Sequence, residues 1–136
     1  MSEPTPAAEG LDDPDAAAFW RAAARGRLVY SQCTSCSAKW FPLRGVCSAC
    51  GGDCAERESA GLGEVYTWSR VHRSGESGFS TQVPYVVAMI ALDEGFRMMA
   101  NVEPEGEVAI GRRCHLSFRP SPATGKPAPL FILDEA

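Results

Sequence analysis

The chain has little of what several classes of protein need. Of its 13 basic residues only two are Lys, only two residues are His, and the formal net charge is −4 over 136 residues. Non-specific nucleic-acid binding requires a basic surface that neutralises phosphates, so this balance argues against it. No apolar run approaches the roughly 20 residues of a membrane-spanning helix. Because neither a Gly-rich phosphate loop nor a GxSxG motif occurs, the sequence offers no strong catalytic motif, and we assign no catalytic residue.

What remains is the composition of an ordinary globular protein, with 45% hydrophobic and 22% charged residues. The first ten residues, MSEPTPAAEG, contain neither a basic stretch nor an apolar stretch. They therefore do not have the pattern of a secretory signal peptide. We expect a cytoplasmic protein.

Four of the six cysteines form two CxxC pairs with ten residues between them. A CxxC turn places two thiolates on one side of a tight knuckle, and two facing knuckles form a tetrahedral sulfur site of the kind that Zn²⁺ prefers. Gly51 and Gly52 follow the second pair and supply the backbone freedom that such a turn needs. The predicted metal ligands are Cys33, Cys36, Cys47 and Cys50.

Other uses of these cysteines are less well supported. Disulfides require an oxidising compartment, and a redox CxxC needs a single pair beside a βαβ pattern. Iron in a rubredoxin-like site remains an alternative to zinc. Because all four positions are thiolates, no position is left for water or substrate, which indicates a structural metal and not a catalytic one. Cys54 lies outside the pairs and is interpreted as a bystander.

The segment before the cysteines predicts a short helix over residues 14–25. Asp13 can cap its N-terminus, Pro14 suits the first helical position, and Gly26 suits the stop. Phe19 and Trp20 must dock on something, either this chain's own ribbon or a partner subunit, because twelve residues are marginal as an isolated helix. The division that we expect is a disordered stretch over 1–13, a docking helix over 14–27, a zinc ribbon over 28–58 and an OB-fold over 59–136.

After Gly61 the hydrophobic period becomes two, which is typical of strands. Pro/Gly-rich and acidic loops separate the strands. A mainly β fold with five short strands predicts a small barrel such as an OB-fold, and a short sandwich is the alternative. The five strands are expected at residues 64–73, 84–92, 96–102, 112–118 and 129–133.

Several side chains are candidates for particular roles. Tyr66, Trp68, Arg70 and His72 alternate onto one strand face, where the aromatics could stack a base and the cations could pair with phosphates. This arrangement would suit coenzyme A or single-stranded nucleic acid, unless the two aromatics fill the barrel. We assign Arg70 and His72 to CoA. We also expect Cys114 to be buried, His115 to be solvated, and Trp40 and Phe41 to cover the metal sulfurs.

The combination of these features resembles the DUF35 family, in which a rubredoxin-like zinc ribbon precedes an OB-fold. The resemblance covers about residues 17–133, and Ser37 departs from it where the family often has Gly. The matching positions are Phe19-Trp20, Gly26-Arg27-Leu28, Gln32-Cys33-x-x-Cys36, Phe41-Pro42, Arg44, Cys47-x-x-Cys50-Gly51, Gly61-x-Gly63-Glu64-Val65-Tyr66, Pro84-Tyr85-Val86-Val87-Ala88, Leu92-x-Glu94-Gly95, Val108, Ile110 and Gly111.

The resemblance implies an accessory role in lipid metabolism. Similar proteins associate with thiolases, with hydroxymethylglutaryl-CoA synthases, and with lipid-transfer-protein-like aldolases that degrade steroid side chains. In those complexes the partner supplies most catalytic residues, and the zinc-ribbon/OB subunit stabilises it and helps to bind acyl-CoA. The leading hypothesis is therefore a non-catalytic subunit in a hetero-oligomer. The alternatives are a nucleic-acid-binding zinc-ribbon/OB module and a stand-alone acyl-CoA thioesterase.

Overall fold

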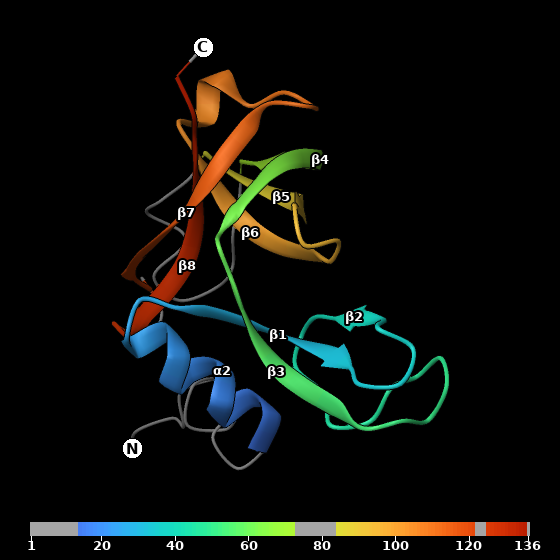
Figure 1. Cartoon of the computed structure of the whole chain (residues 1–136). Coiled ribbons are helices and arrows are strands. Elements are labelled where there is room, and N and C mark those ends of the chain that lie inside the picture. Colours follow the sequence, from blue (N-terminus) through green and yellow to red (C-terminus); the bar gives the residue numbers. More distant parts are fainter. Residues whose placement is uncertain (1–13, 73–83, 122–124, 136) are drawn as a thin grey trace.

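The computed structural model describes residues 14–72, 84–121 and 125–135. The stretch over 1–13 that we expect to be disordered, and the Gly/Ser loop expected at 74–81, lie outside the described residues. A barrel occupies the upper part of Figure 1, and a helix and a small sheet lie below it. The mainly β architecture predicted from the sequence is confirmed.

Helix α2 (Pro14–Ala24) covers one side of the small sheet (Figure 1). The Gly26 N–H donates to the carbonyl of Ala23 at 2.9 Å, and Gly26 has φ of +73°, so this glycine ends the helix as predicted. Phe19 points from the helix to Phe41, with 5.8 Å between ring centroids. Phe19 therefore packs on its own chain, which is the first of its two predicted roles.

The small sheet has the order β2-β1-β3 and is antiparallel throughout. It consists of β1 (Leu28–Cys33), β2 (Lys39–Trp40) and β3 (Cys54–Ser59). The alternating segment at residues 27–32 and the return at residues 39–41 predict the first two strands, in agreement with β1 and β2, but β3 was missed. Its segment CAERES is mostly polar and exposed, so the sequence has no hydrophobic pattern there that would indicate a strand. The strand is held instead by backbone pairing with β1 along its whole length.

Five strands form a closed barrel in the order β4-β5-β6-β8-β7. β6 and β8 pair in parallel and the other pairs are antiparallel. Closure excludes the sandwich, and five strands in this order form the barrel of an OB-fold. The strands are β4 (Leu62–Val71), β5 (Tyr85–Leu92), β6 (Arg97–Glu103), β7 (Arg113–Pro120) and β8 (Pro127–Leu133), and the 3₁₀ turn η1 (Glu105–Glu107) follows β6.

The interior of the barrel is filled by alternate residues of its strands. In β5, which lies between β4 and β6, Val86, Ala88, Ile90 and Leu92 are all buried. Cys114 of β7 is fully buried among them, as predicted for a small hydrophobic residue. His115 points the other way, remains 44% exposed, and pairs with Asp134 at 2.7 Å.

The ribbon and the barrel share one hydrophobic core. Leu28 and Tyr30 of β1 belong to the same buried cluster as the barrel residues. Phe96, just before β6, stacks on Tyr30 with 4.6 Å between centroids and on Phe41 with 5.7 Å. The prediction that Phe41 covers the metal sulfurs was therefore wrong, because its ring packs against the barrel core instead.

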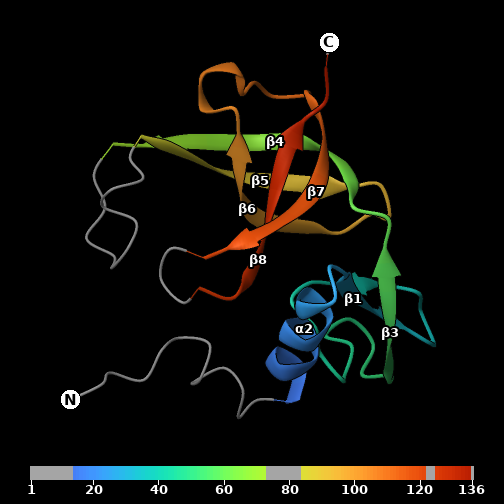
Figure 2. The same cartoon turned by 90° about the vertical axis from the view of Figure 1, so that its left-hand side faces the viewer.

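A carboxylate reinforces this junction, where β3 leads into β4 (Figure 2). Glu94, in the turn between β5 and β6, accepts a hydrogen bond from the Ser59 hydroxyl at 2.8 Å and another from the Ala60 N–H at 2.7 Å. The two structural parts are thus joined by aromatic packing and by charge-assisted hydrogen bonds. Over the described residues, no helix has the length and apolarity needed to cross a membrane.

Candidate metal centre and barrel cavity

The structure brings the four predicted cysteines together. Cys33 ends β1, Cys36 follows in the first turn, and Cys47 and Cys50 lie in the second turn. All four Sγ atoms lie within 4.8 Å of one another, with 3.5 Å between Cys33 and Cys50 and 3.6 Å between Cys36 and Cys47. Because the chain brings four sulfurs to one point, the arrangement has the ligand number and type of a closed tetrathiolate site.

Backbone N–H groups point at these sulfurs. Ser35 and Cys36 donate to Cys33 Sγ at 3.4 Å each, and Ala49 donates to Cys47 Sγ at 3.3 Å. The two backbone donors lower the pKa of Cys33, with burial acting against them. Burial raises the pKa of Cys47, but the backbone N–H donors of Cys50 and Ala49, together with the polar side chains of Trp40 and Cys36 nearby, outweigh burial and lower that pKa to about 6. Donors of this kind stabilise thiolates, which are the metal-binding form.

The Cys50 sulfur is harder to ionise than those of Cys33 and Cys47. The Gly52 N–H favours the Cys50 thiolate, but hydrogen bonds with Cys33 and Cys36 outweigh it and raise the pKa of Cys50 to about 12. Four thiolates this close repel one another unless a cation lies between them. Gly52 leaves space for the first CxxC turn to approach. A Cβ at this position would come within 2.9 Å of Ser35 Oγ and 3.2 Å of Cys33 Sγ. The donor set and its surroundings fit Zn²⁺.

Cys54 lies beside this group without joining it. It is half-buried on β3, directly opposite Cys33 in the strand register. Burial raises its pKa, and the neighbouring Cys33 and Cys47 thiolates raise it further. None of the six cysteines forms a disulfide.

The predicted aromatic and cationic face is only partly formed, because β4 has a β-bulge. The register shifts between Val65 and Thr67, which leaves Tyr66 on the outer surface, 49% exposed. The Arg97 guanidinium lies over the Tyr66 ring, 4.0 Å from its centroid. The prediction that Tyr66 shares a face with Trp68, and its alternative that Tyr66 fills the barrel, were both wrong.

Beyond the bulge, Trp68 and Arg70 lie opposite the buried residues Ala88 and Val86, so both belong to the inner face. Trp68 is half-buried and packs against the core, as the alternative predicted for it. The Arg70 guanidinium lies 5.4 Å from the Trp68 ring, and its Nε forms an ion pair with Glu105 at 2.7 Å. His72 follows the end of β4 and is exposed.

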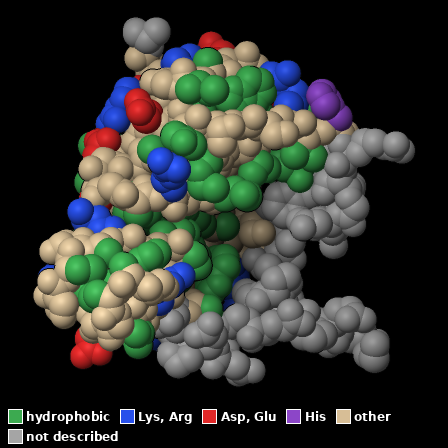
Figure 3. Space-filling model, turned by 90° about the vertical axis from the view of Figure 1, so that its right-hand side faces the viewer, with side chains coloured by type: hydrophobic (Ala, Val, Ile, Leu, Met, Phe, Trp, Pro, Cys, Tyr) green, Lys and Arg blue, Asp and Glu red, His purple; other side chains and the backbone are tan. Residues whose placement is uncertain are grey.

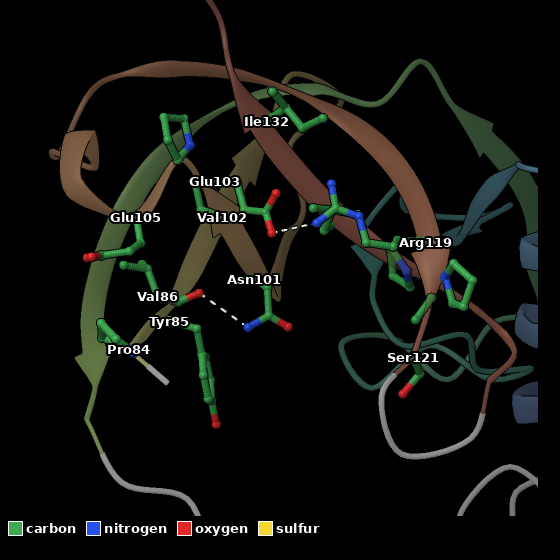
Figure 4. Close-up of a pocket in the computed structure, with 15 residues that line it drawn as sticks. Pro84, Tyr85, Val86, Asn101, Val102, Glu103, Glu105, Arg119, Ser121 and Ile132 are labelled. Carbon is green, nitrogen blue, oxygen red and sulfur yellow. Dashed lines mark hydrogen bonds and ion pairs between the residues drawn. The ribbon is translucent and has the colours of Figure 1, made fainter. Parts of the chain in front are cut away.

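Glu105 also lines a cavity of about 780 Å³ at the same end of the barrel (Figure 4). The walls come from the ends of β5, β6, β7 and β8 and are mostly apolar, with Val86, Val102 and Ile132 among them. An ion pair between Arg119 and Glu103, with 2.6 Å between its atoms, crosses the cavity wall.

Sequence reasoning missed this cavity, since its residues come from four strands. The available signal was a series of prolines at strand ends, where Pro84, Pro104, Pro120 and Pro129 all line it. A space of this size and polarity is typical of small-molecule sites.

These observations define a class of protein: a zinc ribbon fused to an OB-fold, with a four-cysteine metal centre and an apolar cavity at one end of the barrel. Residues 20–55 match the rubredoxin-like zinc ribbon domain of ChsH2, and residues 56–119 match the C-terminal OB-fold domain of ChsH2. The chain therefore belongs to the DUF35 family, as the sequence resemblance indicated.

Three relatives illustrate the range of the family. A DUF35 domain-containing scaffold protein of Methanocaldococcus jannaschii is 36% identical over 97 residues, which are 68% of this chain and 67% of the relative. A probable enoyl-CoA hydratase alpha subunit of Thermomonospora curvata is 38% identical over 87 residues, 62% of this chain but 27% of that longer protein. A solved structure of an Ltp2-ChsH2(DUF35) aldolase superposes with a TM-score of 0.76 at 30% identity, covering 89% of this chain and 95% of that chain.

Proposed function

We propose that this chain is a non-catalytic accessory subunit of a complex that acts on acyl-CoA. The observation that carries the proposal is the likeness to the Ltp2-ChsH2(DUF35) aldolase structure, which extends over 95% of the solved chain. The relatives described as a scaffold protein and as an enoyl-CoA hydratase alpha subunit support it, since both descriptions suit a component of a larger assembly. We place the subunit in the cytoplasm, a reducing compartment that suits cysteines without disulfides.

The partner that we propose is a thiolase-like enzyme, either a lipid-transfer-protein-like aldolase or a thiolase. The reaction of the complex is carbon–carbon bond cleavage or formation on an acyl-CoA, such as steroid side-chain degradation. The partner supplies the catalytic groups, and this chain stabilises the partner and helps to bind the acyl-CoA.

We further propose that Cys33, Cys36, Cys47 and Cys50 hold one structural Zn²⁺. When bound, the ion supplies the folding free energy that a ribbon of this size cannot obtain from a core of its own. The chain positions the sulfurs by two turns and stabilises their anionic form with the N–H donors described above. Because the site has four protein ligands, it does not bind substrate.

The ribbon and helix α2 form the docking surface for the partner in this proposal. Two hydrophobic side chains there are available for contact: Val46, between the CxxC pairs, is 60% exposed, and Trp20 of α2 is only half-buried. In Figure 3 the ribbon forms a lobe that stands clear of the barrel, with hydrophobic side chains in the recess between them. Aromatic and aliphatic side chains in such positions are typical of interface centres.

For CoA, we propose that Arg70 and His72 form the basic edge of the site, next to the cavity, and that the apolar cavity accepts part of the acyl group. The closeness of Arg70 to Trp68 and to the cavity supports this arrangement. Since Arg70 is paired with Glu105, an incoming phosphate must displace that carboxylate.

Co-purification tests the central proposal. A tagged chain expressed in its native source is expected to carry a thiolase-like protein, identified by mass, at a fixed stoichiometry. Val46→Asp is expected to weaken this association while zinc is retained. Met99→Asp is the matched control, because Met99 is also exposed but lies on the barrel. A chain that never associates and never alters the activity of such an enzyme overturns the proposal, and acyl-CoA turnover by the chain alone would favour the thioesterase.

Titration with CoA tests the basic edge separately. Arg70→Ala and His72→Ala are expected to weaken CoA binding to the complex several-fold, because each removes the hydrogen-bond donors that the side chain offers to phosphate. Arg97→Ala is the control, since Arg97 lies on the outer face over Tyr66. Equal affinities for all variants remove Arg70 and His72 from the site and leave the accessory role untouched.

A further inference from the structure

Two buried nitrogens in the ribbon lack a hydrogen-bond acceptor. Among the side chains that the structure describes, the buried N and O atoms without a partner are Trp40 Nε1 and Arg44 Nε. A buried N–H without an acceptor costs roughly 1–3 kcal/mol, so such groups are rare and require an explanation. Both nitrogens belong to the short connection between the two CxxC pairs, and the Arg44 guanidinium lies over the Trp40 ring, 4.6 Å from its centroid.

Both side chains are held beside the second CxxC turn. The Arg44 backbone N–H donates to the buried Ser31 hydroxyl at 2.9 Å, which anchors the residue to β1. Its guanidinium NH1 donates to the hydroxyl of Ser48, the residue after Cys47. These contacts hold Arg44 across the Trp40 ring and against the second CxxC turn.

Backbone pairing also holds this connection against the cysteine turns. The Cys54 N–H donates to the carbonyl of Gly45, the residue after Arg44, at 3.0 Å, and Cys54 lies opposite Cys33 in the strand register. The Trp40 indole lies under the Arg44 guanidinium and is therefore held beside the same turn as Ser48. Two buried N–H groups without an acceptor, one of them on a cationic side chain, thus lie beside the second CxxC turn, whose sulfurs are anionic when a metal binds.

We propose that Trp40 and Arg44 are supporting residues of the metal centre: the indole N–H takes Cys47 Sγ as its acceptor once a metal is bound, and the guanidinium offsets the negative charge of the tetrathiolate. Four thiolates and one Zn²⁺ carry a net negative charge, which an adjacent cation and N–H donors stabilise. This inference depends on the proposed zinc site, and it assigns a role to two residues outside the ligand set.

Zinc competition with a chromophoric chelator tests the inference on the full zinc-loaded chain. Trp40→Phe keeps the ring but removes the N–H, and Arg44→Gln removes the charge. Each is expected to lower zinc affinity by about tenfold, as is usual for groups that support metal ligands. Arg44→Lys is expected to recover part of this loss. Arg27→Gln is the control, because Arg27 belongs to the ribbon but pairs with Glu58 away from the cluster.

Cobalt substitution gives a second readout that a purely structural role would not change. Loss of an N–H···S hydrogen bond alters the donor strength of the sulfur, so Trp40→Phe is expected to shift the thiolate-to-cobalt charge-transfer band, while Arg27→Gln leaves it in place. Affinities within about twofold of the unmodified chain, with unchanged cobalt spectra, overturn the inference. If the unmodified chain itself binds no zinc, the zinc proposal fails as well, and the two failures are thus distinguishable.

Discussion

The Glu94 carboxylate connects the barrel to the ribbon, and its removal tests how firmly the two are joined. One of its oxygens accepts from the Ser59 hydroxyl at 2.8 Å and the other from the Ala60 N–H at 2.7 Å. Ser59 is only 7% exposed, so its hydroxyl has little access to water if the acceptor is lost. Ala60 is exposed, and water can replace its partner.

The expected magnitude follows from this difference. Losing the acceptor of a buried hydroxyl costs roughly 1–3 kcal/mol, and losing that of a solvated N–H costs less. We therefore expect Glu94→Ala to lower the free energy of unfolding by about 2 kcal/mol. For a chain of this size the melting temperature should fall by about 6–10 °C. Glu94→Gln keeps one acceptor oxygen and should fall in between.

Thermal melts of the zinc-saturated chain measure the effect, followed by circular dichroism and calorimetry. The control is Glu58→Ala, which removes a carboxylate of the same ribbon that is 55% exposed and paired with Arg27 at 3.2 Å. Exposed pairs of this kind contribute little to stability. If Glu94→Ala and Glu58→Ala melt at the same temperature, the carboxylate does not hold the junction and the reasoning is refuted.

The remaining predictions concern the cysteines. Cys36→Ser should abolish stoichiometric zinc by elemental analysis, whereas Cys54→Ser should retain it; equal loss in both would place Cys54 in the ligand set. A strong chelator should remove the metal and unfold the ribbon sheet, seen as loss of protection in hydrogen exchange, and protection that is indifferent to chelation would contradict a folding role. Burial raises the pKa of Cys114 to about 11, above the value of about 9 for an unfolded thiol. The protonated thiol therefore contributes its full stability below about pH 9, and this contribution is lost as the pH rises to about 11. Denaturant titrations should show a decline between these values that Cys114→Ala reduces, and identical slopes would exclude Cys114 as its source.

Much of the fold could be predicted because short-range chemistry specifies it. Gly26 ends helix α2 where the sequence predicts, since only a residue tolerant of positive φ suits that stop. The CxxC spacing predicted the sulfur cluster because each turn fixes its two thiolates locally. The apolar segment at residues 84–92 predicted a strand, and β5 (Tyr85–Leu92) forms there.

The features that could not be predicted depend on contacts between distant residues. Strand β3 is polar and owes its place to pairing with β1. Tyr66 leaves the inner face because of a bulge, which shifts the alternation by one residue and has no composition of its own. Phe41 turns to Phe96 because the barrel offers it a buried aromatic partner more than 50 positions away in the chain.

The sequence by itself determined that this protein has a four-sulfur ribbon, an apolar-core barrel and the pattern of the DUF35 family, because residue type and spacing carry each of these. Only the tertiary structure decided where the cavity opens, which aromatics join ribbon to barrel, and that Trp40 Nε1 and Arg44 Nε are buried without an acceptor beside the second CxxC turn. Those arrangements arise when strands far apart in the chain pack together, and their energies depend on burial and on partners that no local pattern specifies.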